Sequence, residues 1–252
     1  MSPIANTLII GKVLYHLENC ESTNIYAKQL LAKNKPPDGT VVSTDNQTAG
    51  RGQFGNKWHS EPNQNMALSV ILFPNLSVNE QFYVSKVASI ACIKALKSIT
   101  NLDFEIKWPN DIYFKNQKVG GVLIENQIAG NKISNSVVGI GINLNQEEFE
   151  GLPNATSIYL LVKYLLNRKK CTEILLQHLD AAYIQLRQNN FTAINTSYFN
   201  HLKAYQTKFH YRVNGAFKEG VLENVNEQGQ LVVRNNGNTF YYNFKEIEWV
   251  LS

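Results

Sequence analysis

Residues 118–143, KVGGVLIENQIAGNKISNSVVGIGIN, hold two apolar runs separated by a short polar turn. The runs at 119–126 and 133–143 have the composition of β-strands, and Ala129-Gly130-Asn131 between them is typical of a hairpin turn. Each run also contains a pair of glycines, and glycine within a strand leaves room for a ligand close to the backbone. This stretch therefore predicts a β-hairpin with a ligand-binding face.

The segments around this hairpin alternate between helical and strand patterns. Apolar residues recur at helical spacing in four segments, and short apolar runs bounded by turn residues indicate further strands. The expected helices are 22–34, 80–99, 173–189 and 192–204, and the expected strands are 40–45, 66–73 and 104–108. These patterns favour an α+β fold in which helices flank a mixed β-sheet.

A different pattern begins at Lys208. Short alternating apolar runs are separated there by the turn pairs Asn214-Gly215, Gln228-Gly229 and Asn236-Gly237. Such spacing predicts a small all-β unit, a compact barrel of about 45 residues. We therefore expect one domain at residues 1–205 and a second, smaller domain at 206–252.

The composition is that of an ordinary globular protein. Of 252 residues, 44% are hydrophobic and 17% are charged, and the formal net charge is +4. Cys20, Cys92 and Cys171 lie far apart and the histidines show no metal-ligand spacing, so we expect reduced thiols and no metal site. No apolar run approaches the roughly 20 residues of a membrane span, and the N-terminus lacks the pattern of a signal peptide. We expect a cytoplasmic protein that binds neither membrane nor DNA.

Residues 50–56, Gly-Arg-Gly-Gln-Phe-Gly-Asn, are the first candidate for a ligand site. Three glycines let the backbone turn its N–H groups toward an anion. Arg51 adds a guanidinium suited to carboxylate or phosphate, and Trp58 adds a flat face on which a base can stack. A glycine-rich turn alone is a weak signal, because many such turns are only structural.

Further polar segments accompany this loop. Lys107-Trp-Pro-Asn-Asp111 follows a strand end, Lys118 precedes the first glycine pair, and Glu21-Ser-Thr-Asn24 stands at a helix start. Each has a structural alternative, since helix caps, surface charges and tight strand packing use the same residue types. Their joint occurrence in one chain favours a binding site for a charged ligand.

With these motifs the chain resembles the biotin–protein ligases. The matching segments are Ser22-Thr23-Asn24, Gln47–Gly52, Lys57-Trp58, Lys107–Asp111, Lys118 with Gly121–Glu125, and Gly139–Asn143. The resemblance implies a class II aminoacyl-tRNA synthetase-like (biotin–lipoate ligase) fold with a small C-terminal SH3-like barrel. It also implies a two-step reaction. Biotin and Mg-ATP give biotinyl-5′-AMP, and a lysine of a biotin carboxyl carrier domain then takes the biotin.

The resemblance also implies roles for individual residues. Arg51 and Lys118 are the expected catalytic residues, because positive charge is needed where a carboxylate meets a triphosphate. Expected biotin-binding residues are Ser22, Thr23, Asn24, Gln47, Gly50, Arg51, Gln53, Lys118, Gly121, Leu123, Gly139 and Gly141. Expected ATP-binding residues are Arg51, Gln53, Asn56, Trp58, Lys107, Asn110, Asp111, Lys118 and Asn143. Among these, Trp58 is expected to stack on adenine and Asn143 to hydrogen-bond it, whereas Asn110 and Asp111 are left open between phosphate, metal and acceptor lysine.

The glycine loop departs from the family pattern. Many members have further arginines there, and this chain has Gln53, Phe54 and Asn56. We expect retention of the adenylate to depend more on Lys118 and on loop amides. We also expect the loop to be mobile without ligand, as well as residues 110–118.

Other functions remain as alternatives. About 15 residues precede the first motif, too few for a helix-turn-helix, so a repressor role is not expected. A lipoate or octanoate ligase or transferase of the same fold and a non-enzymatic biotin-binding module are the two alternatives. The residues do not decide between monomer and homodimer. They also leave open whether the C-terminal domain closes the nucleotide site or receives the acceptor.

Overall fold

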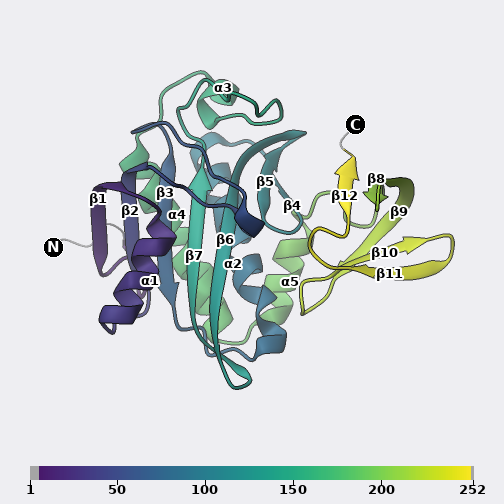
Figure 1. The fold of residues 1–252 in the computed structure, drawn as a ribbon, viewed down its shortest axis with the longest axis horizontal. Coiled ribbons are helices and arrows are strands. Elements are labelled where there is room, and N and C mark those ends of the chain that lie inside the picture. Colours follow the sequence, from purple (N-terminus) through teal and green to yellow (C-terminus); the bar gives the residue numbers. More distant parts are fainter. Residues whose placement is uncertain (1–5, 251–252) are drawn as a thin grey trace.

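Seven strands form one mixed sheet in the order β1-β2-β3-β7-β6-β5-β4 (Figure 1). The structure is a computed structural model that describes residues 6–250, so the outer ends of the two predicted domains lie outside it. The strands are β1 Leu14–Cys20, β2 Thr40–Gln47, β3 Met66–Leu72, β4 Glu105–Lys107, β5 Asp111–Phe114, β6 Gln117–Ala129 and β7 Lys132–Ile142. β1 runs parallel to β2, and the other neighbours are antiparallel. The predicted α+β class is confirmed.

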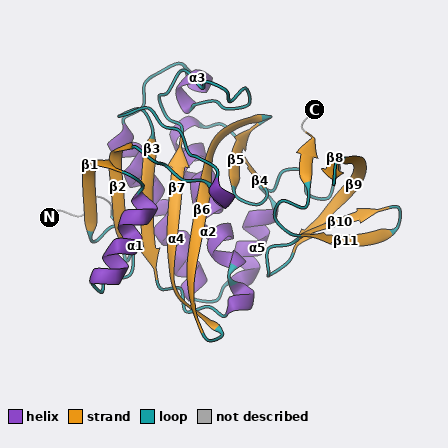
Figure 2. Ribbon diagram, viewed as in Figure 1, coloured by secondary structure: helices purple, strands orange, loops and turns teal. Residues whose placement is uncertain are grey.

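Helices cover the two faces of this sheet unequally (Figure 2). On one face α2 (Phe82–Thr100) packs against β4 to β7, and α4 (Arg168–Arg187) and α5 (Phe191–Phe199) pack against α2. On the other face α1 (Thr23–Lys33) packs against β2, β3 and β7. The short α3 (Ile158–Val162) lies at one end of the sheet. The face that α1 shares is therefore less covered than the face of α2.

Alternation along β6 and β7 determines which residues reach the open face. Val122, Val138 and Ile140 are buried in the core that α2 closes. Side chains alternate between faces along a strand, so the odd-numbered positions point the other way. The ladder places Gly121 opposite Gly141 and Leu123 opposite Gly139, which brings the glycine-rich positions together on the face of α1.

The C-terminal strands form a separate antiparallel sheet in the order β11-β10-β9-β8-β12. Its strands are β8 Lys208–Val213, β9 Ala216–Val225, β10 Leu231–Asn235, β11 Asn238–Tyr242 and β12 Glu248–Val250. The predicted small β unit is thus present. In residues 208–250 the ladders leave β11 and β12 as the edges of this five-stranded sheet, an arrangement consistent with the SH3-like domain that we expected.

In the larger domain, two strands and one α-helix were not predicted from the sequence, namely β1, β5 and α3. The segment 110–118, which we expect to be mobile without ligand, contains β5, and Asp111–Phe114 pairs in the sheet between β4 and β6. Helix α4 begins five residues earlier than expected because the Asn167 side chain caps it, accepting a hydrogen bond from the Lys170 N–H at 3.0 Å.

Candidate active site

A cavity of about 490 Å³ opens on the face of α1, where the glycine loop, the β4–β5 turn, β6, β7 and the C-terminal sheet meet. Every residue that the sequence analysis assigned to a site lines this cavity, except Gly50 and Asn143. The sequence motifs are thus brought together from six separate segments. The volume lies in the range of cavities that hold small organic ligands.

One end of the cavity is polar and holds few charges. Ser22, Thr23 and Asn24 are each 3% exposed at the start of α1. The Thr23 N–H donates to Gln47 Oε1 at 2.9 Å, and the Ser69 hydroxyl lies 2.7 Å from Thr23 Oγ1 and 2.6 Å from Asn24 Oδ1. Ser22 is the N-cap residue of α1 by position, but its side chain makes no capping hydrogen bond. This hydroxyl network is suited to a neutral ligand with N–H and C=O groups.

Glu125 lies beside this network on β6. Its Oε2 accepts from Asn24 Nδ2 at 2.8 Å, and its Oε1 forms an ion pair with Lys28 Nζ at 2.7 Å. Burial alone would raise the pKa of Glu125, but the hydrogen bonds and charge of its partners lower it overall. Glu125 therefore remains a carboxylate that orients Asn24.

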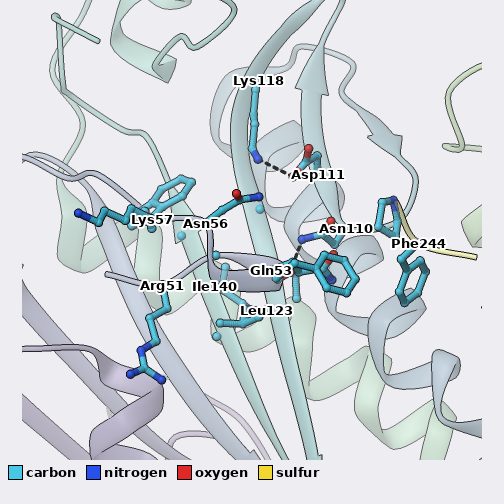
Figure 3. Close-up of a pocket in the computed structure, with 18 of the residues that line it drawn as sticks. Arg51, Gln53, Asn56, Lys57, Asn110, Asp111, Lys118, Leu123, Ile140 and Phe244 are labelled. Carbon is cyan, nitrogen blue, oxygen red and sulfur yellow. Dashed lines mark hydrogen bonds and ion pairs between the residues drawn. The ribbon is translucent and has the colours of Figure 1, made fainter. Parts of the chain in front are cut away.

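The opposite end of the cavity contains charged side chains (Figure 3). Lys118 Nζ lies 2.6 Å from Asp111 Oδ1, across the β5–β6 ladder. Asn110 Nδ2 donates to the Val122 carbonyl at 2.7 Å, which fixes the amide group in the turn before β5. Lys107 Nζ lies over the rings of Tyr113 and Trp249, at 5.4 and 5.8 Å from their centroids. Burial lowers the pKa of Lys107, and the nearby Asp111 charge opposes this shift.

The glycine loop forms the rim of the cavity. Its backbone folds on itself, with hydrogen bonds from Gly52 N–H to Asn56 O at 2.7 Å and from Trp58 N–H to Gly50 O at 2.9 Å. A Cβ at Gly50 would collide with the Trp58 carbonyl, so Gly50 closes the base of the loop instead of lining the cavity. Arg51 is exposed and extends away from the Lys118–Asp111 pair in Figure 3. The two expected catalytic cations thus do not converge in this structure.

Two glycines of β7 pack closely, as their structural alternative had it, but against side chains that the sequence did not indicate. A Cβ at Gly141 would lie 2.7 Å from ring atoms of Trp58, and a Cβ at Gly139 would collide with the Asn24 side chain. The indole and the amide therefore rest directly on the strand. The two glycines thus leave room for the side chains of Trp58 and Asn24. These two side chains, together with Leu123, form the wall of the cavity.

Asn143 belongs to a second cavity of about 240 Å³. Trp58 and Lys118 line both cavities, so the two adjoin. Asn143 Nδ2 donates to the Thr156 carbonyl at 3.0 Å, whereas its Oδ1 is buried without a partner in the described part of the chain. The Trp58 Nε1 is also buried and unpartnered there. Unpaired buried polar atoms beside a cavity indicate a ligand that completes them.

The C-terminal sheet contributes a wall that the sequence analysis missed. The larger cavity is lined by Phe244, Lys245, Ile247, Glu248 and Trp249, and the first two of these contact Phe54 of the glycine loop. One feature of the sequence could have indicated a contact partner for the glycine loop, namely Phe54, a large aromatic residue among small and polar ones. Its partner could not be read from local sequence, because it lies 190 residues further along the chain.

Residues 6–250 contain no group of three or more His, Cys, Asp and Glu side chains placed to hold a metal ion. No helix among those residues is long and apolar enough to cross a membrane.

Comparison with known proteins identifies the class to which this fold and site belong. Residues 17–143 match the model of the biotin/lipoate A/B protein ligase family, and the chain belongs to this family. The matched segment begins in β1 and ends directly after β7, so it contains every motif that lines the larger cavity apart from the C-terminal wall.

Individual relatives and solved structures narrow the resemblance. The chain is 28% identical over 236 residues to the bifunctional ligase/repressor BirA of Bacillus subtilis, covering 91% of this chain and 72% of that protein. It is 31% identical over 173 residues to the biotin–[acetyl-CoA-carboxylase] ligase of Mycobacterium tuberculosis, covering 67% of this chain and 63% of that one. The structure of a biotin protein ligase from Aquifex aeolicus in complex with biotin and ATP superposes with a TM-score of 0.77 at 27% identity, covering 96% of this chain and all of the other.

Proposed function

We propose that this protein is an ATP-dependent biotin–protein ligase. The observation that supports this most directly is the larger cavity, which places a neutral hydrogen-bonding end and a cationic end on one strip of glycine-rich sheet. Relatives and a superposable structure at 27% identity are biotin ligases, and that structure contains biotin and ATP. The lipoate alternative has no comparable support.

The neutral end is suited to the ureido ring of biotin. Ser22, Thr23 and Gln47 offer hydroxyl and amide groups without charge, and Asn24 is held by Glu125 and Ser69. A site that hydrogen-bonds such a ring rejects analogues that lack its N–H and C=O groups. Leu123 supplies the apolar wall along which the valeryl chain extends toward Lys118.

The cationic end is suited to the first chemical step. The biotin carboxylate attacks the α-phosphorus of ATP, the bond to the bridging oxygen breaks, and pyrophosphate leaves. Both reactants are anions, so their approach and the negative charge of the transition state need fixed positive charge. We assign this role to Lys118, and its 2.6 Å contact with Asp111, which orients the ammonium group, supports the assignment. The second cavity is suited to adenine, where Trp58 offers a ring and Asn143 an unpaired acceptor.

In the second step an acceptor lysine attacks the carbonyl carbon of the mixed anhydride. The new amide bond forms, AMP leaves with the bonding electron pair, and the lysine loses a proton. We propose a biotin carboxyl carrier domain as the acceptor. No side chain of this chain needs to be acylated.

The same proposal includes Mg²⁺, which neutralises charge on the ATP phosphates when bound. Mg²⁺ keeps several waters and is usually held by one or two carboxylates together with phosphates. Asp111 and the Asn110 side-chain oxygen are the donors available at the cationic end. This sparse set fits an ion that arrives with the nucleotide.

Transfer of labelled biotin to a purified biotin carboxyl carrier domain tests the proposal. We expect ATP-dependent labelling of one acceptor lysine and equimolar release of pyrophosphate. Lipoate in place of biotin should give no pyrophosphate. Biotin binding without any pyrophosphate release would instead favour the binding module.

We further propose that the part of the glycine loop around Arg51 closes when both substrates bind, bringing the Arg51 side chain toward the phosphates while the loop tip at Phe54 keeps its contact with the C-terminal sheet. Arg51 is exposed in the present structure, so trypsin should cleave after it. Cleavage at Arg51 should slow when biotin and ATP are added together, and equal cleavage with and without them would contradict loop closure.

A further inference from the structure

Phe54 connects the tip of the glycine loop to the C-terminal sheet. Its ring lies 6.1 Å from the ring of Phe244, and the Lys245 ammonium lies 4.5 Å from the Phe54 centroid. Both partners belong to the turn between β11 and β12. All three side chains line the larger cavity, so this contact closes one side of its rim.

The partners of Phe54 are themselves rigidly held. Phe244 packs on Trp108 at 5.2 Å and on Phe82 at 6.3 Å, both buried residues of the larger domain. Trp108 Nε1 donates to the Gly229 carbonyl at 2.9 Å. A Cβ at Gly229 would lie 2.6 Å from the Phe82 ring, so the β9–β10 turn rests directly on α2. Phe54 thus contacts a fixed surface.

The loop itself has a conformation that needs such support. Phe54 has φ +57°, in the left-handed region that residues with a Cβ rarely adopt, and Gly55 follows at φ +83°. That conformation is unfavourable for a residue with a Cβ. The aromatic pair with Phe244 and the cation–π contact with Lys245 are favourable interactions that oppose this cost.

We propose that Phe54, Phe244 and Lys245 form a latch that holds the glycine loop over the acyl-adenylate and sets how slowly this intermediate escapes. This inference rests on the proposed function. The loop has Gln53, Phe54 and Asn56, and Arg51 is its one arginine. Ion pairs between loop side chains and the phosphates therefore order this loop less than they would order a loop with several arginines. The latch replaces part of that contribution with a contact to the protein's own C-terminal sheet. Phe54 and Lys245 act as positioning residues.

The latch is tested by following the adenylate after a single turnover. Enzyme, labelled biotin and ATP are mixed without acceptor, pyrophosphatase is added, and free adenylate is separated from protein over time. The variants are Phe54→Ala, Phe54→Tyr and Lys245→Met. Phe240→Ala is the matched control, because Phe240 lies under Lys218 at 5.8 Å in the same sheet, but the pair lines none of the described cavities.

We expect Phe54→Ala to release adenylate about tenfold faster, Lys245→Met about threefold faster, and Phe54→Tyr and Phe240→Ala at the wild-type rate. A second readout is biotin on lysines of a bystander such as serum albumin, which should rise in the same order. Release from Phe54→Ala within twofold of wild type would overturn the latch, as would Phe54→Tyr releasing as fast as Phe54→Ala. If the wild-type enzyme forms no adenylate at all, the proposed function fails, and the latch with it.

Discussion

At the scale of single residues, Lys118 and Asp111 have the most direct chemical consequence. Their 2.6 Å contact joins β5 to β6 at the cationic end of the cavity, where the sequence motif alone placed both residues. Because the carboxylate orients the ammonium group, Lys118 is prepared for an incoming anion before substrate arrives. Such preorganised charge is more effective than charge that must be rearranged during the reaction.

Replacing Lys118 therefore tests the chemistry without testing the fold. We expect Lys118→Ala to slow adenylate formation by about 10²–10³-fold, the usual effect of removing one fixed stabilising group. Biotin binding in the absence of ATP should change much less. Pyrophosphate release and calorimetric titration measure the two effects. Lys170→Ala, at an exposed pair with Glu173, is the control and should leave both unchanged.

Lys86 gives a prediction about pH. It is 2% exposed on α2, donates to Asn195 Oδ1 at 2.8 Å, and lies within 6 Å of four aromatic ring centroids. Burial lowers its pKa from 10.5 to about 8, partly opposed by the Glu227 charge. Between these two values the unfolded chain binds the proton and the folded chain does not. Raising the pH through this window therefore stabilises the folded state.

The size of this effect is measured against Lys86→Met, which cannot titrate. The free energy of unfolding of the wild type, relative to that of the variant, should rise by up to about 3 kcal/mol between pH 8 and 10.5. Below pH 8 the difference should be constant. Urea unfolding at several pH values gives both curves, and parallel curves throughout would show that Lys86 does not titrate in this range.

At the scale of elements, the β6–β7 hairpin explains why glycine is needed at particular positions. Gly139 and Gly141 lie under Asn24 and Trp58, whereas a Cβ at Gly121 would approach Asp111 Oδ1 no closer than 3.3 Å. Adding atoms to a packed site typically costs 1–3 kcal/mol. We expect Gly141→Ala and Gly139→Ala to lower the free energy of unfolding by about 1–3 kcal/mol. Gly121→Ala should cost less than about 1 kcal/mol, and equal losses in urea unfolding for all three would contradict this packing.

The same elements show how far the sequence could predict the structure. The hairpin was predicted because its turn and its apolar runs are local features. Strand β1 was missed because Leu14–Cys20 has no buried face, and it becomes a strand only by pairing with β2. Residues 111–114 were assigned to no element because a four-residue strand gives too short a pattern to recognise.

The candidate site shows the same division. Motif residues on β4, β6, β7 and the start of α1 could be predicted, because the resemblance and the spacing place them. Ser69, Phe244 and Trp249 could not, since each reaches the site through a contact between distant segments. The orientation of Arg51 also depends on the folded loop and not on its sequence.

At the scale of the whole molecule, the C-terminal sheet and its loops form part of the wall of the candidate active site. We propose a domain boundary at residues 205/206, which lie in the segment between the end of α5 at Phe199 and the start of β8 at Lys208. The chain already pairs with β9 at this point, because the Gln206 N–H donates to the Leu222 carbonyl at 2.8 Å. The small domain is therefore attached both by its linker and by the contacts around Trp108.

Trp108 tests whether those contacts hold the two domains together. Trp108→Phe removes the donor to the Gly229 carbonyl and leaves a small void, a loss of about 2 kcal/mol. Amide hydrogen exchange should then accelerate in residues 226–249, while the core of α4 keeps its protection. Trp249→Phe is the matched control, because the Trp249 Nε1 is buried without a partner in residues 6–250 and no hydrogen bond is lost. Equal acceleration in both variants would mean that packing alone, and not the Trp108–Gly229 bond, joins the C-terminal sheet to the active site.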